Sequence, residues 1–291
     1  MDSPNPRRPR LLTPVLLAAL LTLVVLAALL GRTFLLGGSQ PAAAQDGLIA
    51  FERYVENAPA PPQIAVINAD GTDLIPLTTD GRAFDPARSP DGTRLAYYLV
   101  DPDNYRIGDF FVSGDIFVID AGGSNSTRLT TDGRNLDPTW SPDGTKLAYV
   151  SDPASESGEM YDPPAQIFVM DADGSSPTSL TTDGENRDPA WSPDGTKIAY
   201  ASTPAGGGKS AIYVMAADGA NLTRLTPSDE RGHQMDPAWS PDGTRIALAS
   251  NREDYALRIY MMDADGANLT RLSPEYGTAP AWAPAAAAEA P

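Results

Sequence analysis

The chain has 291 residues, with 21 Lys or Arg against 38 Asp or Glu, so its formal net charge at pH 7 is −17. Four arginines against one aspartate give the first 45 residues a charge of +3, which leaves −20 for the remainder. So large an acidic excess excludes nucleic acid as a partner. The chain has no cysteine, which excludes disulfides and a lipidated cysteine anchor.

The first 46 residues have the layout of an export signal, with a basic stretch followed by an apolar run and then by small residues. Residues 1–10 are basic and predict a cytoplasmic tail, and the apolar run from Leu11 to Leu30 is long enough to span a hydrocarbon core. We predict a signal anchor or a signal peptide over 11–36 and a flexible linker over 37–46. Two outcomes stay open: a single-pass membrane protein with its domain on the extracytoplasmic side, or a secreted or periplasmic protein cleaved near Ala44.

The rest of the chain is built on one repeated eight-residue segment. It reads DPARSPDG from Asp85, DPTWSPDG from Asp137 and DPAWSPDG from both Asp188 and Asp236, and it returns in part as APAWAP from Ala279. A period near 50 residues with strand-like content is typical of propeller blades. Within the segment, Asp-Pro favours an extended entry, and SPDG supplies the Pro and Gly of a tight turn.

Three further strands are expected in each repeat. The third repeat shows them as the apolar KIAYAS from Lys197, then AIYVMAADG from Ala211 with its acidic glycine turn, then LTRLT from Leu222. Residues 48–79 hold a second, third and fourth strand without a first, and 279–284 hold a first strand alone. We therefore predict an all-β fold, a propeller of five four-stranded blades over 47–284, closed by the C-terminal strand and preceded by an N-terminal apolar helix. Residues 285–291 are expected to form a disordered tail.

These repeats resemble those of a known family. The segment SPDGTKIAY from Ser192, followed by acidic glycine turns and TRLT, is similar to the TolB-like (WD-like) β-propeller repeat over about residues 46–284. The resemblance implies a propeller whose loops bind a partner. Five blades depart from the six that are typical of TolB itself, so the binding partners of TolB are not transferred directly.

Strand direction separates two faces of such a propeller. The SPDG and DADG turns share one face and are nearly identical, whereas the second-to-third and fourth-to-first loops share the other face and vary. Variable loops on a rigid scaffold commonly carry binding, and exposed aromatic residues among acidic ones are typical of protein-binding patches. The candidate partner-binding residues are Tyr105, Phe110, Phe111, Tyr161, Tyr255 and Tyr276.

The variable face is also expected to hold a ring of carboxylates at the mouth of the central channel. Its members are Asp85, Asp137, Asp188 and Asp236. The ring is a candidate metal site for Ca²⁺, because hard cations take several oxygen ligands, and the alternative is that each aspartate caps its own loop. No other cofactor is expected. Four tryptophans recur in the first strands and predict packing between blades, namely Trp140, Trp191, Trp239 and Trp282.

Catalysis finds little support in the sequence. The single histidine, His233, is expected to be solvated in a loop, and neither a nucleophile elbow nor a metal-ligand cluster accompanies it. We predict that the chain is not an enzyme. It is expected to be a non-catalytic protein-protein interaction scaffold in the cell envelope, with an envelope or extracellular protein as partner. The alternative is a carbohydrate-active enzyme or a glycan-binding propeller that uses carboxylates at the channel.

Overall fold

The computed structural model describes residues 48–54, 62–68, 70–79, 81–101, 113–152, 164–227, 232–253 and 256–282. The chain divides into two compact units, Met1–Thr33 and Phe34–Pro291, and all described residues belong to the second. The tail at 1–10, the anchor or signal at 11–36, the linker at 37–46 and the tail at 285–291 lie outside these ranges. Within them, no helix is long and apolar enough to cross a membrane.

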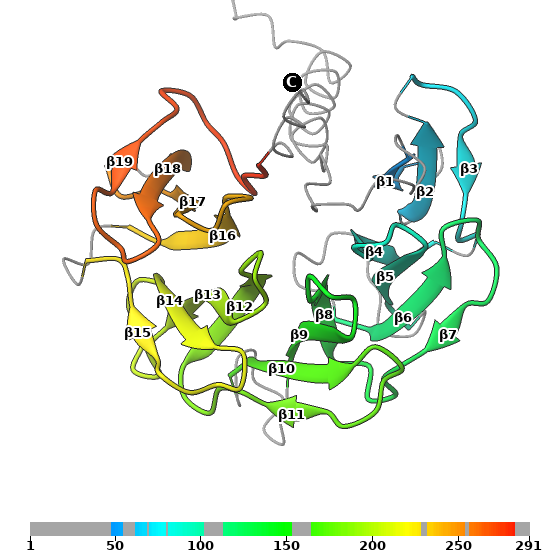
Figure 1. Ribbon diagram of the computed structural model, residues 1–291, viewed down its shortest axis with the longest axis horizontal. Coiled ribbons are helices and arrows are strands. Elements are labelled where there is room, and N and C mark those ends of the chain that lie inside the picture. Colours follow the sequence, from blue (N-terminus) through cyan, green and yellow to red (C-terminus); the bar gives the residue numbers. More distant parts are fainter. Residues whose placement is uncertain are drawn as a thin grey trace, which may run out of the picture. The chain divides into compact units, whose positions relative to one another are not determined.

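The described residues form nineteen strands in five antiparallel sheets, which follow one another around a common centre (Figure 1). The first blade is β1(Leu48–Arg53), β2(Gln63–Asn68) and β3(Ile75–Pro76), and the second is β4(Ala83–Arg88), β5(Arg94–Leu99), β6(Asp115–Asp120) and β7(Thr127–Arg128). The third blade is β8(Asn135–Trp140), β9(Lys146–Ser151), β10(Gln166–Asp171) and β11(Thr178–Ser179). The fourth is β12(Glu185–Trp191), β13(Lys197–Thr203), β14(Ala211–Ala216) and β15(Thr223–Arg224), and the fifth is β16(Gln234–Trp239), β17(Arg245–Ser250), β18(Arg258–Asp263) and β19(Thr270–Arg271).

The predicted all-β propeller is confirmed. Blades two to five pair their four strands in chain order, and the three strands of the first blade correspond to the second, third and fourth strands of the others. The predicted closing segment lies beside the fifth blade, where Ala279 N–H donates to Asp236 Oδ2 at 2.9 Å and Trp282 Nε1 donates to Ala238 O at 2.9 Å. Among the described residues, no ladder joins this segment to β1, so that pairing stays a prediction.

Each inner strand has a bulge at its Asp-Pro pair. The ladder of β12 with β13 shifts register between Arg187 and Ala190, and equivalent shifts occur in β4, β8 and β16. Proline has no N–H to give to a ladder, and the preceding aspartate has a left-handed backbone, with φ of 56° at Asp188. The Asp-Pro pair therefore forms a bulge that turns the aspartate out of the ladder, whereas the sequence alone predicted an extended entry.

The SPDG turn is closed by its own polar groups. In the fourth blade, Ser192 Oγ donates to Asp194 Oδ1 at 2.6 Å and accepts the N–H of Lys197 at 2.9 Å. Asp194 Oδ1 also accepts the N–H of Thr196 at 3.0 Å, and Gly195 has a φ of +70° that favours glycine. The same bonds recur around Ser89, Ser141 and Ser240. These turns are rigid because their polar groups bind one another.

The hydrophobic core lies between consecutive blades. One cluster joins Tyr98 and Ile116 of the second blade to Leu147 and Met170 of the third, and three further clusters join the other consecutive pairs. The predicted packing of the tryptophans is also found, since Trp239 Nε1 donates to Ala190 O of the preceding blade at 3.2 Å. Trp140 and Trp282 bind the preceding blade in the same way. Trp191 differs, because its buried Nε1 has no hydrogen-bond partner among the described residues.

Candidate functional site

The predicted aspartate ring is assembled by the bulges of the inner strands. Asp85, Asp137, Asp188 and Asp236 each have a φ between 46° and 56°, and Ala279 repeats this backbone conformation with a φ of 46°. A non-glycine residue adopts this conformation only at an energetic cost, and Asp tolerates it better than most residues because its short side chain can form local hydrogen bonds. The repeated bulge thus places one acidic side chain per inner strand at equivalent positions.

The carboxylates of this ring bind across blade boundaries. Asp188 Oδ2 accepts the N–H of Asp236 at 3.1 Å, and Asp236 Oδ2 in turn accepts the N–H of Ala279 at 2.9 Å. Because the acceptor and the donor belong to consecutive blades, these aspartates cap the next inner strand. The alternative expected from sequence, in which each aspartate caps its own loop, does not account for these two bonds.

Glu52 supplies the corresponding carboxylate from the first blade. Its Oε1 accepts the N–H of Asp85 at 3.1 Å, which is the bond that an inner-strand aspartate makes elsewhere. Glu52 lies on β1, which has the place of a second strand in its blade, so the periodic pattern of the aspartates gave no indication of this role. Only its acidic character within LIAFER could have drawn attention to it.

Arg187 is the second residue that sequence reasoning missed. Its Nη2 lies 2.6 Å from Glu185 Oε1 and 3.6 Å from Asp152 Oδ1, so it joins the third and fourth blades. Its guanidinium also acts electrostatically on Asp137 and Asp188. A signal was present in the sequence, because the residue before the repeated aspartate is Phe84, Leu136 or Met235 in the other copies. A charged residue at a repeat position that is apolar in the other copies indicates a charged partner near that position.

Burial and mutual repulsion raise the pKa values of the central aspartates. Desolvation is the largest cause for Asp137, whose pKa lies well above the usual range, followed by the charges of Asp85 and Asp188. Desolvation also raises the pKa of Asp188 to about 7, with repulsion from Asp236 as the next cause. The Arg187 charge opposes both shifts. The cluster therefore holds protons at a pH at which isolated aspartates have lost them.

The described residues contain no group of three or more His, Cys, Asp or Glu side chains arranged to hold a metal ion. The four aspartates predicted as calcium ligands are near enough to influence one another, but Asp188 and Asp236 each give an oxygen to a backbone N–H. Calcium binding at this ring stays a prediction.

Most of the predicted partner-binding aromatics cannot be placed. Tyr105, Phe110, Phe111, Tyr161 and Tyr255 lie outside the described residues. Tyr276 is described and is 67% exposed. The neighbouring Gly277 N–H donates to Leu257 O at 2.9 Å, which places Tyr276 next to the second-to-third loop of the fifth blade. This position agrees with the variable face predicted for it.

His233 is held more firmly than expected. It is partly buried, its N–H donates to Asn251 Oδ1 at 2.6 Å, and its Nδ1 lies 3.3 Å from Ser210 Oγ. Its Nε2 lies 3.3 Å from Lys209 Nζ. Desolvation, and then the Lys209 charge, lower the pKa of His233. The histidine therefore links a loop of the fourth blade to the start of the fifth, and the expectation of a solvated side chain is wrong.

These features define a β-propeller with a carboxylate cluster at its centre. Among solved structures, TolB from Acinetobacter baumannii superposes with a TM-score of 0.62 at 21% identity, covering 80% of this chain and 54% of that one. A Mycobacterium tuberculosis puromycin-hydrolyzing peptidase superposes with a TM-score of 0.57 at 20% identity, covering 83% and 39%. An oligogalacturonate lyase in complex with manganese gives a TM-score of 0.53 at 13% identity, covering 83% and 77%.

Curated relatives agree with the fold. The chain is 46% identical over 71 residues to the Tol-Pal system protein TolB of Methylococcus capsulatus, a match that covers 24% of this chain and 15% of the relative. It is 31% identical over 151 residues to the TolB homolog of Chlorobium luteolum, covering 51% and 30%. No protein-family model matches the chain. The predicted resemblance to TolB-like propellers is confirmed by the fold and by these matched stretches of sequence, which span less than a third of the length of each of these two relatives.

The prediction that the chain is not an enzyme is contradicted. The chain is 37% identical over 136 residues to an uncharacterized peptidase, YuxL, of Bacillus subtilis, a match that covers 46% of this chain and 18% of the relative. Peptidases and a lyase are also among its structural neighbours. Repeats of this kind therefore occur in enzymes as well as in TolB, and the lack of a catalytic motif in this chain does not exclude an enzymatic role.

Proposed function

We propose that the chain is an exported TolB-like propeller that binds a protein partner of the cell envelope through its variable face. The observation that carries this proposal is the difference between the two faces. The SPDG and DADG turns satisfy their polar groups internally, as Asp173 Oδ1 does for the N–H of Ser175 at 2.9 Å. The opposite face carries loops of unequal length beside a partly buried acidic cluster.

Export is supported by the basic residues and the apolar run at the N-terminus. A single-pass anchor would hold the domain at the membrane, and cleavage near Ala44 would release it. Residues 37–46 would reach at most about 35 Å when extended, because a chain spans up to about 3.5 Å per residue. An uncleaved anchor would then keep the face with the SPDG turns toward the membrane, since β1 starts on that side. Protease accessibility of intact cells, together with the mass of the purified protein, distinguishes the two forms.

Capture of envelope proteins on the immobilised full chain tests the binding face. Replacing Phe110 and Tyr161 together by Ala, or Tyr276 alone by Ala, is expected to reduce the captured partner without a change in melting temperature. Matched changes on the opposite face, Asp171→Asn and Asp218→Asn, are expected to leave capture intact. Loss of capture from only the Asp171 and Asp218 variants would assign binding to the opposite face and overturn the proposal.

A second candidate function is a role in peptide hydrolysis, favoured by the 37% identity to the Bacillus subtilis peptidase over 136 residues. In this case the propeller would present peptides to a catalytic group. Incubation of the purified chain with a defined peptide mixture, followed by mass spectrometry, tests the idea. Cleavage that is lost in Asp188→Asn would locate it at the carboxylate ring. An unchanged mixture would remove intrinsic peptidase activity from consideration.

A further inference from the structure

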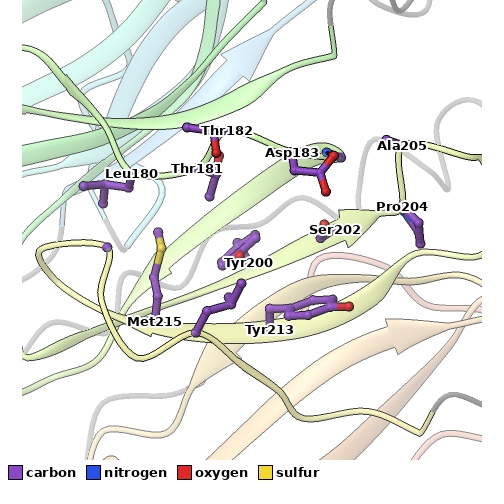
Figure 2. Close-up of a pocket in the computed structure, with 13 residues that line it drawn as sticks. Leu180, Thr181, Thr182, Asp183, Tyr200, Ser202, Pro204, Ala205, Tyr213 and Met215 are labelled. Carbon is purple, nitrogen blue, oxygen red and sulfur yellow. Dashed lines mark hydrogen bonds between the residues drawn. The ribbon is translucent and has the colours of Figure 1, made fainter.

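A pocket of about 290 Å³ lies between the third and fourth blades (Figure 2). Its apolar wall consists of Leu180, Met215 and Leu222 with the rings of Tyr200 and Tyr213. Its polar rim is formed by side chains from the loop that follows β11 and from the end of β13, namely Thr182, Asp183 and Ser202. The volume is at the lower end of the range of ligand pockets and fits one long side chain or a small molecule.

The two tyrosines give the pocket a flat aromatic surface. Their ring centroids are 6.0 Å apart with an interplanar angle of 27°. The second and third blades have a Tyr and a Phe at the same two positions, as in the Tyr149 and Phe168 pair. Only in the fourth blade, among these described pairs, do both rings carry a hydroxyl. An aromatic wall of this kind accepts the alkyl stem or the planar head of a cationic side chain.

The carboxylate of Asp183 is the charged group of the rim. Among the described residues its contacts are limited to the N–H of Gly184, which donates to Oδ1 at 2.9 Å, and no Lys or Arg pairs with it. The equivalent Asp132 in the third blade accepts a bond from Asn135 Nδ2. The corresponding Asn186 Nδ2 instead binds Gln166 Oε1 at 3.1 Å and two backbone carbonyls. The Asp183 carboxylate is thereby left to face a ligand.

The mouth of the pocket is kept open by a short loop. Residues 204–210 join β13 to β14, whereas residues 100–114 and 152–165 form the equivalent loops of the second and third blades. The short loop contains Gly206, Gly207 and Gly208, and a Cβ added at any of them would meet no atom within 4 Å. Pro204 and Ala205 line the pocket and are exposed, so a chain from outside can reach it.

From this geometry we infer that the pocket between the third and fourth blades binds an arginine side chain of a peptide segment in the partner protein. The guanidinium pairs with Asp183, and the methylenes cover Leu180 and Met215. At the Tyr213 ring the guanidinium shares the aromatic surface with Arg224, whose Cζ lies 6.0 Å from the ring centroid. An arginine fits best because its planar fork both stacks on rings and pairs with carboxylates. The charge of −20 on the chain beyond residue 45 attracts such a segment from a distance. This inference rests on the proposed function and names the chemistry of the partner.

Fluorescently labelled Ac-Ala-Arg-Ala-NH₂ tests the site on the full chain by polarisation, with Ac-Ala-Gln-Ala-NH₂ as the uncharged probe. The arginine peptide is expected to bind at low salt and the glutamine peptide is not. Asp183→Asn removes the charge with little change of shape and is expected to weaken binding at least about tenfold, as the loss of a charge-assisted pair does. Ala205→Trp fills the mouth and is expected to do the same.

The matched control is Asp132→Asn, which removes the same charge from the preceding blade and is expected to leave binding unchanged. Equal weakening by Asp132→Asn would show attraction to the overall charge and overturn the inference, as would equal binding of the glutamine peptide. If unlabelled free arginine competes as well as the unlabelled peptide, the ligand of the pocket is a free amino acid and the inference of a peptide segment is overturned. Capture of an envelope partner that persists in Asp183→Asn and fails in the Phe110 and Tyr161 variant would leave the proposed function standing without this inference.

Discussion

Gly266 lies directly against the backbone of Leu225, so that a Cβ added to the glycine would stand 2.5 Å from the leucine carbonyl oxygen. Gly266 belongs to the third-to-fourth turn of the fifth blade, and Leu225 directly follows β15, the outer strand of the fourth. The same relationship joins Gly219 to Leu180 and Gly174 to Leu129. Consecutive blades therefore touch through a turn that is tight for a Cβ, with 3.2 Å at Gly219 and Gly174 and no room for one at Gly266.

This contact predicts that Gly266→Ala destabilises the fold by more than its backbone conformation alone requires. Gly71 is the matched control, because it has a similar φ of +84° but no atom within 4 Å of an added Cβ. A left-handed alanine costs about 1–2 kcal/mol, which is the full effect expected for Gly71→Ala. Urea unfolding should show a clearly larger loss for Gly266→Ala. Equal losses would mean that the blade contact adds nothing.

The central aspartates predict a stability that falls between about pH 4 and pH 7. The pKa of Asp188 is near 4 in the unfolded chain and about 7 in the folded one, so the folded state binds more protons in this interval. Unfolding then becomes easier as the pH rises, with each pKa unit of difference corresponding to about 1.4 kcal/mol. Melting temperatures measured from pH 4.5 to pH 8 should decline for the wild type.

Asp188→Asn and Asp137→Asn are expected to flatten this decline, since an amide keeps the shape of the neutral acid without its titration. The turn residue Asp242 serves as the control. Its pKa is lowered to about 2, chiefly by its hydrogen bond from Ser240, so its contribution is complete above pH 4 and is lost only in stronger acid. Asp242→Asn should therefore leave the slope between pH 4.5 and pH 8 unchanged. A wild-type protein that gains stability toward pH 8 would contradict the raised pKa values of Asp137 and Asp188.

The turn serines predict equal and additive losses. Ser192→Ala leaves the partly buried N–H of Lys197 without its acceptor, and the expected cost is about 1 kcal/mol, at the lower end of the range for an unsatisfied buried group. The same change at Ser141 should cost about as much, because its bond to Lys146 N–H is also 2.9 Å. The turns around Ser89 and Ser192 belong to the second and fourth blades, which are not neighbours, so the Ser89→Ala and Ser192→Ala double variant should show the sum in chemical unfolding. The neighbouring exposed Thr196→Val should have a smaller effect.

The tryptophans predict unequal responses to an otherwise identical change. Trp239→Phe removes the bond to Ala190 O and is expected to destabilise the fold by about 1 kcal/mol beyond the loss of ring area. Trp191→Phe removes a buried Nε1 that has no partner among the described residues, so it should be tolerated better. Thermal denaturation of the two variants side by side gives the comparison. A larger drop in melting temperature for Trp191→Phe than for Trp239→Phe would contradict the absence of a hydrogen-bond partner for Trp191 Nε1 among the described residues.

The fold could be predicted because its causes are local and repeated. Ser192 and Asp194 of the SPDG turn act through bonds within a few residues, and four copies of the pattern supply the period of the blades. The recurrence of one aspartate in each inner strand from β4 to β16 followed from the same period, although the aspartates lie within these strands and not at their entry. The bulge itself was not foreseen, because it depends on the partner strand as well as on the Asp-Pro pair.

The site could be predicted only where it shares that period. Glu52 takes the role of an aspartate but lies on a second strand, not on an inner one. The lack of a bond from Asn186 to Asp183 depends on Gln166, the acceptor that Asn186 finds in the preceding blade. Neither arrangement has a spacing that a sequence can display. The hold of Ser210 and Asn251 on His233 likewise arises where two blades meet, so the solitary histidine was misjudged as solvated.

The carboxylate bonds between inner strands have a direction. Glu52 accepts from Asp85, Asp188 from Asp236, and Asp236 from Ala279, so at these three junctions the earlier segment supplies the carboxylate and the next inner strand supplies the N–H. The methyl group of Ala279 cannot accept a further N–H, so the series of carboxylate bonds ends at this residue. A repeat of this kind therefore donates a backbone N–H to the preceding repeat and offers a carboxylate to the next one. A duplicated repeat would find an acceptor for its N–H in the repeat before it and a donor for its carboxylate in the repeat after it. Evolution or design can therefore change the number of blades by copying a segment.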